Sequence, residues 1–115
     1  PVMFDGSVVF SDESGKIFGL NPADGSVNWA LDAGGSVTAG ILPLESSFVI
    51  VREDGTLTVY NMSDRAPVWT RTIEGQVYST PILAGDKIFI GVKGNVLLQA
   101  YDLNGNLVWS FTPGR

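Results

Sequence analysis

The even spacing of the three tryptophans constrains the fold more than any other feature of this 115-residue chain. Trp29, Trp69 and Trp109 stand 40 residues apart, and each ends a related stretch, of which the first runs from Gly19 to Trp29. A fixed period of about 40 residues is typical of repeat proteins. The chain therefore contains three copies of one unit, and the third copy stops five residues short of the full period.

A shift of the sequence by 40 residues aligns segments 1–40, 41–80 and 81–115 and places apolar side chains in the same columns. These columns are Val2, Leu42 and Ile82; Val8, Phe48 and Ile88; Val9, Val49 and Phe89; Phe10, Ile50 and Ile90; and Ile17, Leu57 and Leu97. Each copy holds four short runs rich in Val, Ile, Phe and Tyr, separated by turn residues, which indicates strands joined by hairpins. We expect four antiparallel strands in each of the approximate segments 1–35, 41–75 and 81–115.

The second strand of every copy is a continuous apolar run, as in Phe48 to Val51, rather than an alternating one. Such a run indicates that both faces of the sheet are covered. A four-stranded propeller blade has this period, whereas an immunoglobulin-like sandwich of this length has about seven strands without internal repetition. The sequence predicts an all-β fold of three four-stranded antiparallel β-propeller blades, as a partial propeller or half of a six-bladed ring. In the third copy a shorter last hairpin predicts a β-bulge near Gln99.

Composition excludes several classes of function. The net charge is −5 and the seven basic residues do not cluster, so we expect no nucleic-acid partner. The chain has no cysteine and no histidine, which excludes the usual zinc sites, thiol nucleophiles and an imidazole base. No apolar run approaches the roughly 18 residues that a membrane-spanning helix needs. Catalysis would have to rely on carboxylates, lysine or tyrosine.

The stretch from Gly19 to Trp29 resembles the docking motif A-x-D-x-x-T-G-K-x-x-W of the pyrroloquinoline-quinone-type β-propeller repeats. The matching residues are Gly19, Asn21, Gly25 and Trp29 in the first copy; Val59, Asn61 and Trp69 in the second, with Arg65 in place of the Gly; and Ala100, Asp102, Gly105 and Trp109 in the third. The resemblance implies that each tryptophan packs flat against the neighbouring blade and that the small residue in the Ala place lets backbones approach. The Asn or Asp is expected to cap its turn rather than to bind metal.

The resemblance leaves three classes of function open. Quinoprotein dehydrogenases of this family use an acidic base, calcium and often a cysteine pair, which is absent here. Other members are binding scaffolds without a cofactor. We therefore expect a non-catalytic, extracytoplasmic scaffold that binds a protein partner or further blades and needs no cofactor. The alternatives are a fragment of a dehydrogenase that binds pyrroloquinoline quinone with calcium, and a ligand-binding sensor domain.

Paired carboxylates occur on equivalent turns, at Asp12 and Glu13 and at Glu53 and Asp54, with Lys93 at that place in the third copy. Such oxygens can bind calcium, but acidic residues beside glycine are also usual at hairpin turns, and we interpret them as turn residues. The family resemblance places a binding surface on these turns and on the segments that lead into the innermost strands. Its candidate residues are Asp12, Glu13, Ser36, Arg52, Glu53, Asp54, Gln76, Tyr78 and Lys93. Arg52 and Tyr78 rank first because Arg and Tyr are enriched among interface hot spots.

Three blades are too few for a closed propeller, which typically has four to eight. Two blade faces would be left in water, so we expect either further repeats in a longer chain or a second copy that completes a six-bladed ring. If the chain is complete as given, it should be a homo-oligomer.

Overall fold

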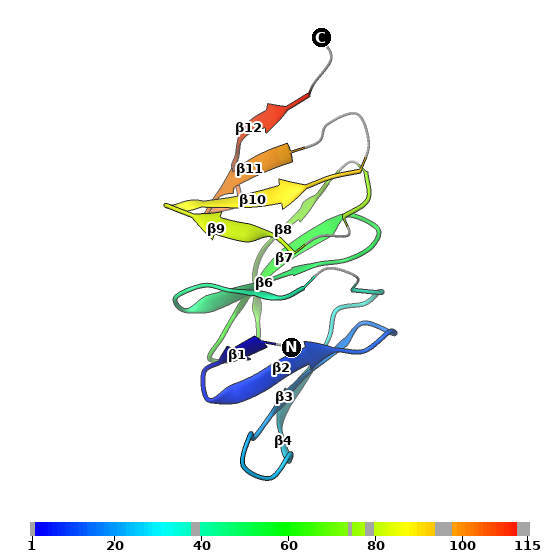
Figure 1. The fold of residues 1–115 in the computed structure, drawn as a ribbon, viewed down its shortest axis with the longest axis vertical. Coiled ribbons are helices and arrows are strands. Elements are labelled where there is room, and N and C mark those ends of the chain that lie inside the picture. Colours follow the sequence, from blue (N-terminus) through cyan, green and yellow to red (C-terminus); the bar gives the residue numbers. More distant parts are fainter. Residues whose placement is uncertain (1, 38–39, 74, 78–79, 94–97, 113–115) are drawn as a thin grey trace.

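The protein is described here by a computed structural model, which covers residues 2–37, 40–73, 75–77, 80–93 and 98–112. Three four-stranded antiparallel sheets form in this part of the chain, and in each sheet the strands lie side by side in sequence order. Figure 1 shows the three sheets, here called blades 1 to 3, following one another along the longest of the principal axes, whose extents are 53 × 27 × 20 Å. Within the described ranges, no helix is long and apolar enough to cross a membrane.

The strands lie where the repeat predicts them. Blade 1 contains β1 (Val2–Phe4), β2 (Ser7–Ser11), β3 (Lys16–Leu20) and β4 (Val27–Asp32). Blade 2 contains β5 (Leu42–Pro43), β6 (Ser47–Val51), β7 (Thr56–Asn61) and β8 (Pro67–Thr72). Blade 3 contains β9 (Ile82–Ala84), β10 (Lys87–Gly91), β11 (Leu98–Asp102) and β12 (Leu107–Phe111). The predicted all-β propeller blades are confirmed. The sequence predicts the third strand of the third copy at 95–102, and its part at 95–97 lies outside the described residues.

Two apolar clusters hold the blades together. One joins blades 1 and 2, where Val9 and Ile17 pack with Phe48, Ile50 and Tyr60. The other joins blades 2 and 3 and consists of Val49, Val51, Leu57, Val59 and Ile73 packed with Val77, Ile88, Ile90, Val92 and Tyr101. The hydrophobic core therefore lies between the sheets, because each blade buries one face of its sheet against the next.

Among the described residues, only those of the central blade are covered on both faces of their sheet. All of Phe48, Val49, Ile50 and Val51 in β6 are at most 1% exposed. The equivalent strands β2 and β10 alternate instead, with buried residues separated by partly exposed ones. The continuous apolar runs of β2 and β10 thus each have one uncovered side.

A β-bulge recurs at the same place in all three blades. The pairing of the third and fourth strands shifts register between Gly19 and Leu20, between Val59 and Tyr60, and between Ala100 and Tyr101. The fourth strand supplies the extra residue each time. The bulge predicted near Gln99 is confirmed next to that residue. It belongs to the repeat as a whole, however, and is not caused by the shorter hairpin of the third copy.

Candidate functional sites

The turns between the third and fourth strands are capped by their Asn or Asp side chains. Oδ1 of Asn21 accepts a hydrogen bond from the Ala23 amide at 2.9 Å, and Oδ1 of Asn61 accepts one from the Ser63 amide at 2.9 Å. In blade 3, Asp102 Oδ1 accepts from the amides of Asn104 and Asn106, both at 2.9 Å. The predicted Asx interaction is confirmed, so the polar residues of the motif stabilise turns.

Trp69 shows how one blade docks on the next. Its Nε1–H donates to the Leu103 carbonyl in the turn of blade 3 at 3.0 Å. Its ring lies so close to Gly105 that a Cβ there would be 2.7 Å from Trp69 Cδ2. A side chain at position 105 would therefore displace the ring, and Gly105 also has φ +89°, which favours glycine.

Arg71 adds to this junction, and sequence reasoning missed it. Its Nε–H donates to the Gly105 carbonyl at 2.7 Å, and its guanidinium carbon lies 5.6 Å from the centre of the Trp69 ring. Such a cation–π contact stabilises by about 0.5–1 kcal/mol at an exposed site. The repeat gave no signal for it, because the register-equivalent residues in the other blades are Leu31 and Phe111.

At the junction of blades 1 and 2, Arg65 makes the cation–π contact with the tryptophan that Arg71 makes at the junction of blades 2 and 3. Trp29 packs on Phe48 of blade 2, with ring centres 5.7 Å apart. Arg65, which stands where the motif has Gly, extends its guanidinium over Trp29 at 5.4 Å from the ring centre. Its backbone has φ +60°, a conformation that costs a non-glycine residue about 1–2 kcal/mol. The cation–π contact offsets part of that cost.

Two residues of the motif differ from the expectation. The small residue in the Ala place makes room for the tryptophan of its own blade, because a Cβ at Gly19 would overlap the Trp29 ring. Trp109 is 43% exposed, since the described chain supplies no blade beyond blade 3 to cover it. Gly25 has φ +74°, and a Cβ there would meet nothing within 4 Å.

On the candidate interaction face, Asp12 is held within its own turn. Its Oδ1 accepts hydrogen bonds from the Ser14 hydroxyl at 2.7 Å and from the Lys16 amide at 2.9 Å. These two bonds hold the pKa of Asp12 below its ordinary value of 3.8. Asp12 is therefore a charged turn cap at neutral pH, as interpreted from the sequence.

Arg52 is occupied by contacts inside the protein. Nη2 forms an ion pair with Asp54 Oδ2, and Nη1 donates to the Ala33 carbonyl at 3.3 Å. The guanidinium also covers the backbone of Gly35, where a Cβ would be 2.9 Å from Arg52 Nε. Hydrogen bonding from Thr56, with a smaller contribution from Arg52, lowers the pKa of Asp54 below 3.8. Arg52 thus fastens the chain that crosses from blade 1 to blade 2.

A polar hollow of about 320 Å³ lies beside this ion pair and is lined by Ser36, Glu53, Asp54 and Gln76. The Glu53 amide donates to the Ser36 carbonyl at 2.8 Å. The Lys93 amide donates to the Gln76 carbonyl at 2.8 Å in the same way. Each bond joins an entering segment to the turn of its own blade, and the hollow lies where the turn of blade 2 meets the entering segment of blade 3.

Of the other candidate residues, the two acidic residues of blade 1 lie away from this hollow. Asp12 and Glu13 belong to the turn of blade 1 and do not line it. Tyr78 lies outside the described residues. Among the residues whose placement is described, no group of three or more Asp and Glu side chains is arranged to bind a metal ion.

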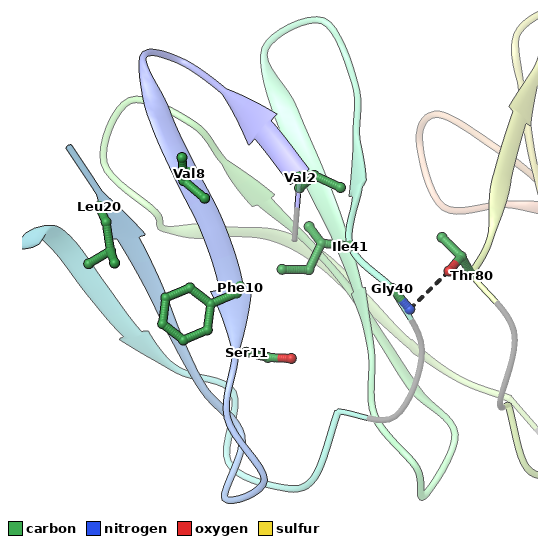
Figure 2. A pocket seen from close by; sticks show the side chains of 8 residues that line it. All are labelled: Val2, Val8, Phe10, Ser11, Leu20, Gly40, Ile41 and Thr80. Carbon is green, nitrogen blue, oxygen red and sulfur yellow. Dashed lines mark hydrogen bonds between the residues drawn. The ribbon is translucent and has the colours of Figure 1, made fainter. Parts of the chain in front are cut away.

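An apolar cavity beside β2 does not fit the quinone cofactor of the family's dehydrogenases. It has a volume of about 630 Å³ and is lined by Val2, Val8, Phe10, Ser11, Leu20, Gly40, Ile41 and Thr80. Figure 2 shows the apolar side chains of β2 and β3 on one side and the hydrogen bond from the Gly40 amide to Thr80 Oγ1, at 3.1 Å, on the other. Pyrroloquinoline quinone carries three carboxylates, and this lining offers no cationic side chain to pair with them.

Comparison with solved structures shows the fold. BamB from Moraxella catarrhalis is 20% identical with a TM-score of 0.81, and the match covers 96% of this chain and 34% of that one. Two quinohemoprotein alcohol dehydrogenases, from Comamonas testosteroni (21% identity, TM-score 0.81) and Pseudomonas putida (19%, 0.84), match 97% of this chain and 20% of their own. The chain thus spans about a third of BamB and a fifth of the dehydrogenases.

Sequence comparison shows the family. No curated protein sequence matches the chain significantly. One family's sequence pattern, described as outer membrane protein assembly factor BamB, matches residues 13–114, which include the second half of blade 1 and all of blades 2 and 3. The chain therefore belongs to the BamB family of β-propeller repeat proteins.

Proposed function

We propose that residues 1–115 are a non-catalytic part of a larger propeller that acts outside the cytoplasm as a scaffold and binds a protein partner. The polar hollow lined by Ser36, Glu53, Asp54 and Gln76 carries the proposal, because it gathers hydrogen-bonding side chains from two blades on one face. The family's description as an outer membrane assembly factor supports both the kind of partner and the compartment.

The partner surface should be basic. Two carboxylates line the hollow, and the side chain of Asp54 is 53% exposed although it pairs with Arg52. Arg52 forms its ion pair with Asp54 and not with Glu53. Lysine or arginine on a partner can therefore bind the Glu53 carboxylate without breaking that ion pair. Charged contacts of this kind raise the association rate and weaken with salt.

A photo-crosslinking amino acid at position 53 tests the proposal. We expect one partner to be captured from the source cells by this position, and the captured protein to show a basic patch. The matched control is position 63, because Ser63 lines a hollow of similar size, about 330 Å³, at the opposite ends of the strands. Equal capture at both positions would contradict the assigned face.

Point substitutions then measure affinity for the captured partner. Glu53→Lys should weaken binding at least tenfold at low salt and less at high salt, while leaving the melting temperature unchanged. Arg52→Ala and Tyr78→Ala test the residues ranked first from the sequence. Arg52→Ala requires a parallel stability measurement, because that side chain also bonds the Ala33 carbonyl. Unchanged affinity in all three variants would refute the proposal.

The fold similarity to dehydrogenases makes quinone binding the second candidate. We propose that this part of the chain binds no cofactor, since the large cavity lacks cationic partners for a tricarboxylate. Equilibration with pyrroloquinoline quinone and calcium, followed by dialysis and absorption spectroscopy, should leave no bound chromophore. Retention of one quinone per chain would favour the dehydrogenase alternative instead.

A further inference from the structure

The turns between the second and third strands change their charge from blade to blade. The three sheets stack in the same orientation (Figure 1), so these turns lie on one face of the stack. Glu13, Glu53 and Lys93 occupy equivalent positions of the repeat in the three turns. The Glu53 amide donates to the Ser36 carbonyl and the Lys93 amide donates to the Gln76 carbonyl, each at 2.8 Å. The turns of blades 2 and 3 therefore present opposite charges from the same backbone position.

The turn of blade 1 is acidic. Asp12 stays ionised at neutral pH, because a hydrogen bond from the Ser14 hydroxyl lowers its pKa, and Glu13 beside it is exposed. Lys16 and Asp32 are cross-strand partners of opposite charge, so their charges offset each other. Asp12 and Glu13 therefore give this turn a negative charge.

The charge is weaker at blade 2 and is reversed at blade 3. Arg52 forms an ion pair with Asp54, which leaves Glu53 as the uncompensated charge of its turn. Lys93 is exposed, and neither Glu53 nor Lys93 belongs to an ion pair within the part of the chain that the structure describes. Residues 94–97 add no charge to the turn of blade 3. The face therefore runs from negative at blade 1 to positive at blade 3.

The spacing of the blades lets a partner respond to each turn separately. Packed sheets lie about 10 Å apart, which exceeds the Debye length of about 8 Å at physiological ionic strength. Charges on neighbouring turns are therefore largely screened from one another, and a bound partner responds to the local charge rather than to the net charge. The polar hollow beside Glu53 provides a recess at the middle of the row.

We infer that the partner is a protein segment that lies across the blades, with basic side chains over Glu13 and Glu53 and an acidic side chain over Lys93. This inference rests on the proposed function and specifies the charge pattern of the same partner. A segment bound in the opposite direction would place like charges together at both ends of the row, which is strongly unfavourable. The reversal of charge at Lys93 therefore fixes the direction in which the segment lies.

Synthetic peptides of eight residues test the pattern on the full chain, because an extended octapeptide spans about 27 Å and reaches all three turns. The dipolar peptide contains three lysines, two serines and three glutamates in that order. The alternating peptide has the same composition, with lysine and glutamate alternating. Fluorescence anisotropy at low salt should show at least about fivefold tighter binding of the dipolar peptide, because only the order of the charges differs. The preference should weaken at high salt.

Charge substitutions assign the preference to particular residues. Lys93→Glu should weaken binding of the dipolar peptide about fivefold and strengthen binding of a basic peptide with six lysines and two serines. Lys87→Glu is the matched control, because it makes the same charge change at the other end of β10, where Lys87 pairs with Asp86 at 2.9 Å. It should leave the ratio of dipolar to alternating affinity unchanged. Circular dichroism checks folding, and Lys93→Gln, which should abolish the preference, replaces Lys93→Glu if that variant unfolds.

Equal binding of the dipolar and alternating peptides, or binding of neither, would overturn the inference. Tighter binding of the dipolar peptide by Lys93→Glu would also overturn it and would indicate a uniformly basic partner. The basic peptide separates this result from a failure of the proposed function. If Glu53→Lys weakens binding of the basic peptide while the order of charges has no effect, the acidic binding face stands and only the reversed charge at blade 3 is refuted.

Discussion

Replacement of Trp69 should destabilise the protein more than replacement of Trp109, although the two residues are repeats of each other. The Trp69 ring lies against Gly105, stacks on Tyr101 with ring centres 6.4 Å apart, and donates to the Leu103 carbonyl at 3.0 Å. A tryptophan side chain buries on the order of 200 Å², which corresponds to about 5 kcal/mol at 25 cal/mol per Å² as an upper bound. Measured aromatic-to-alanine changes cost about 3–5 kcal/mol, and the lost hydrogen bond adds about 1 kcal/mol.

Trp109 contacts Phe89 of its own blade, with ring centres 5.6 Å apart, and is 43% exposed. Burial of rather more than half of its surface corresponds to at most about 3 kcal/mol. We therefore expect Trp69→Ala to lower the free energy of unfolding by about 4 kcal/mol and Trp109→Ala by about 2 kcal/mol. The first value is a large part of the roughly 5–15 kcal/mol that stabilises a typical domain.

Urea unfolding followed by far-UV circular dichroism measures both values. The variants are compared at the same protein concentration and in the same buffer. Trp69→Phe serves as a further control, because it retains the apolar ring and removes the indole N–H that bonds Leu103. Equal losses for Trp69→Ala and Trp109→Ala, or a loss below about 1 kcal/mol for Trp69→Ala, would refute the assignment of Trp69 as the docking residue.

Three further predictions concern the motif turns and are measured by thermal and urea unfolding. Gly105→Ala should lower the free energy of unfolding by at least about 2 kcal/mol more than Gly25→Ala. Both glycines have positive φ, but only at position 105 would the new Cβ meet a tryptophan ring. Equal losses would contradict docking at Gly105. Arg65→Ala should destabilise the protein by about 0.5–1 kcal/mol, because it removes the cation–π contact with Trp29. Arg65→Gly should be nearly neutral, because glycine relieves the strain of the positive φ and so offsets the lost contact. Identical losses for the two variants would argue against that compensation. Hydrogen bonds from the backbone and side chain of Asn106 hold the pKa of Asp102 below 3.8. The ionised carboxylate therefore stabilises the protein above pH 3.8, and this stabilisation is lost as the pH falls through the lowered pKa. The melting temperature of Asp102→Asn should depend less on pH below about pH 4 than that of the unmodified chain.

The strands could be predicted from the sequence because their signals are local. A run such as Phe48 to Val51 and the turn residues beside it decide whether a strand forms, and the repeat provides three estimates of each boundary. Burial could not be predicted in the same way. Val8 and Phe48 occupy one column and are both apolar, yet only Phe48 is fully buried, because burial depends on whether another blade follows on that side.

The candidate sites were predicted in part. Glu53, Asp54 and Gln76 were assigned to one surface through the family resemblance, and they line one hollow. Arg52 was ranked first as a binding residue, but its bond to the Ala33 carbonyl depends on how the chain crosses between blades, which no local pattern encodes. The same holds for Arg65, whose contact with Trp29 joins residues of different blades.

The recurring bulge affects how the outer rim of the blades meets other proteins. The strands β4, β8 and β12 are the outer edges of their sheets, and they expose Val27, Val68, Leu107 and Val108 to solvent. A flat apolar edge would pair with the edge of another molecule and lead to aggregation. Because each edge strand carries one extra residue, its free amides and carbonyls are out of phase with a regular incoming strand. The bulge therefore protects the fourth-strand edge of each described sheet from uncontrolled strand addition.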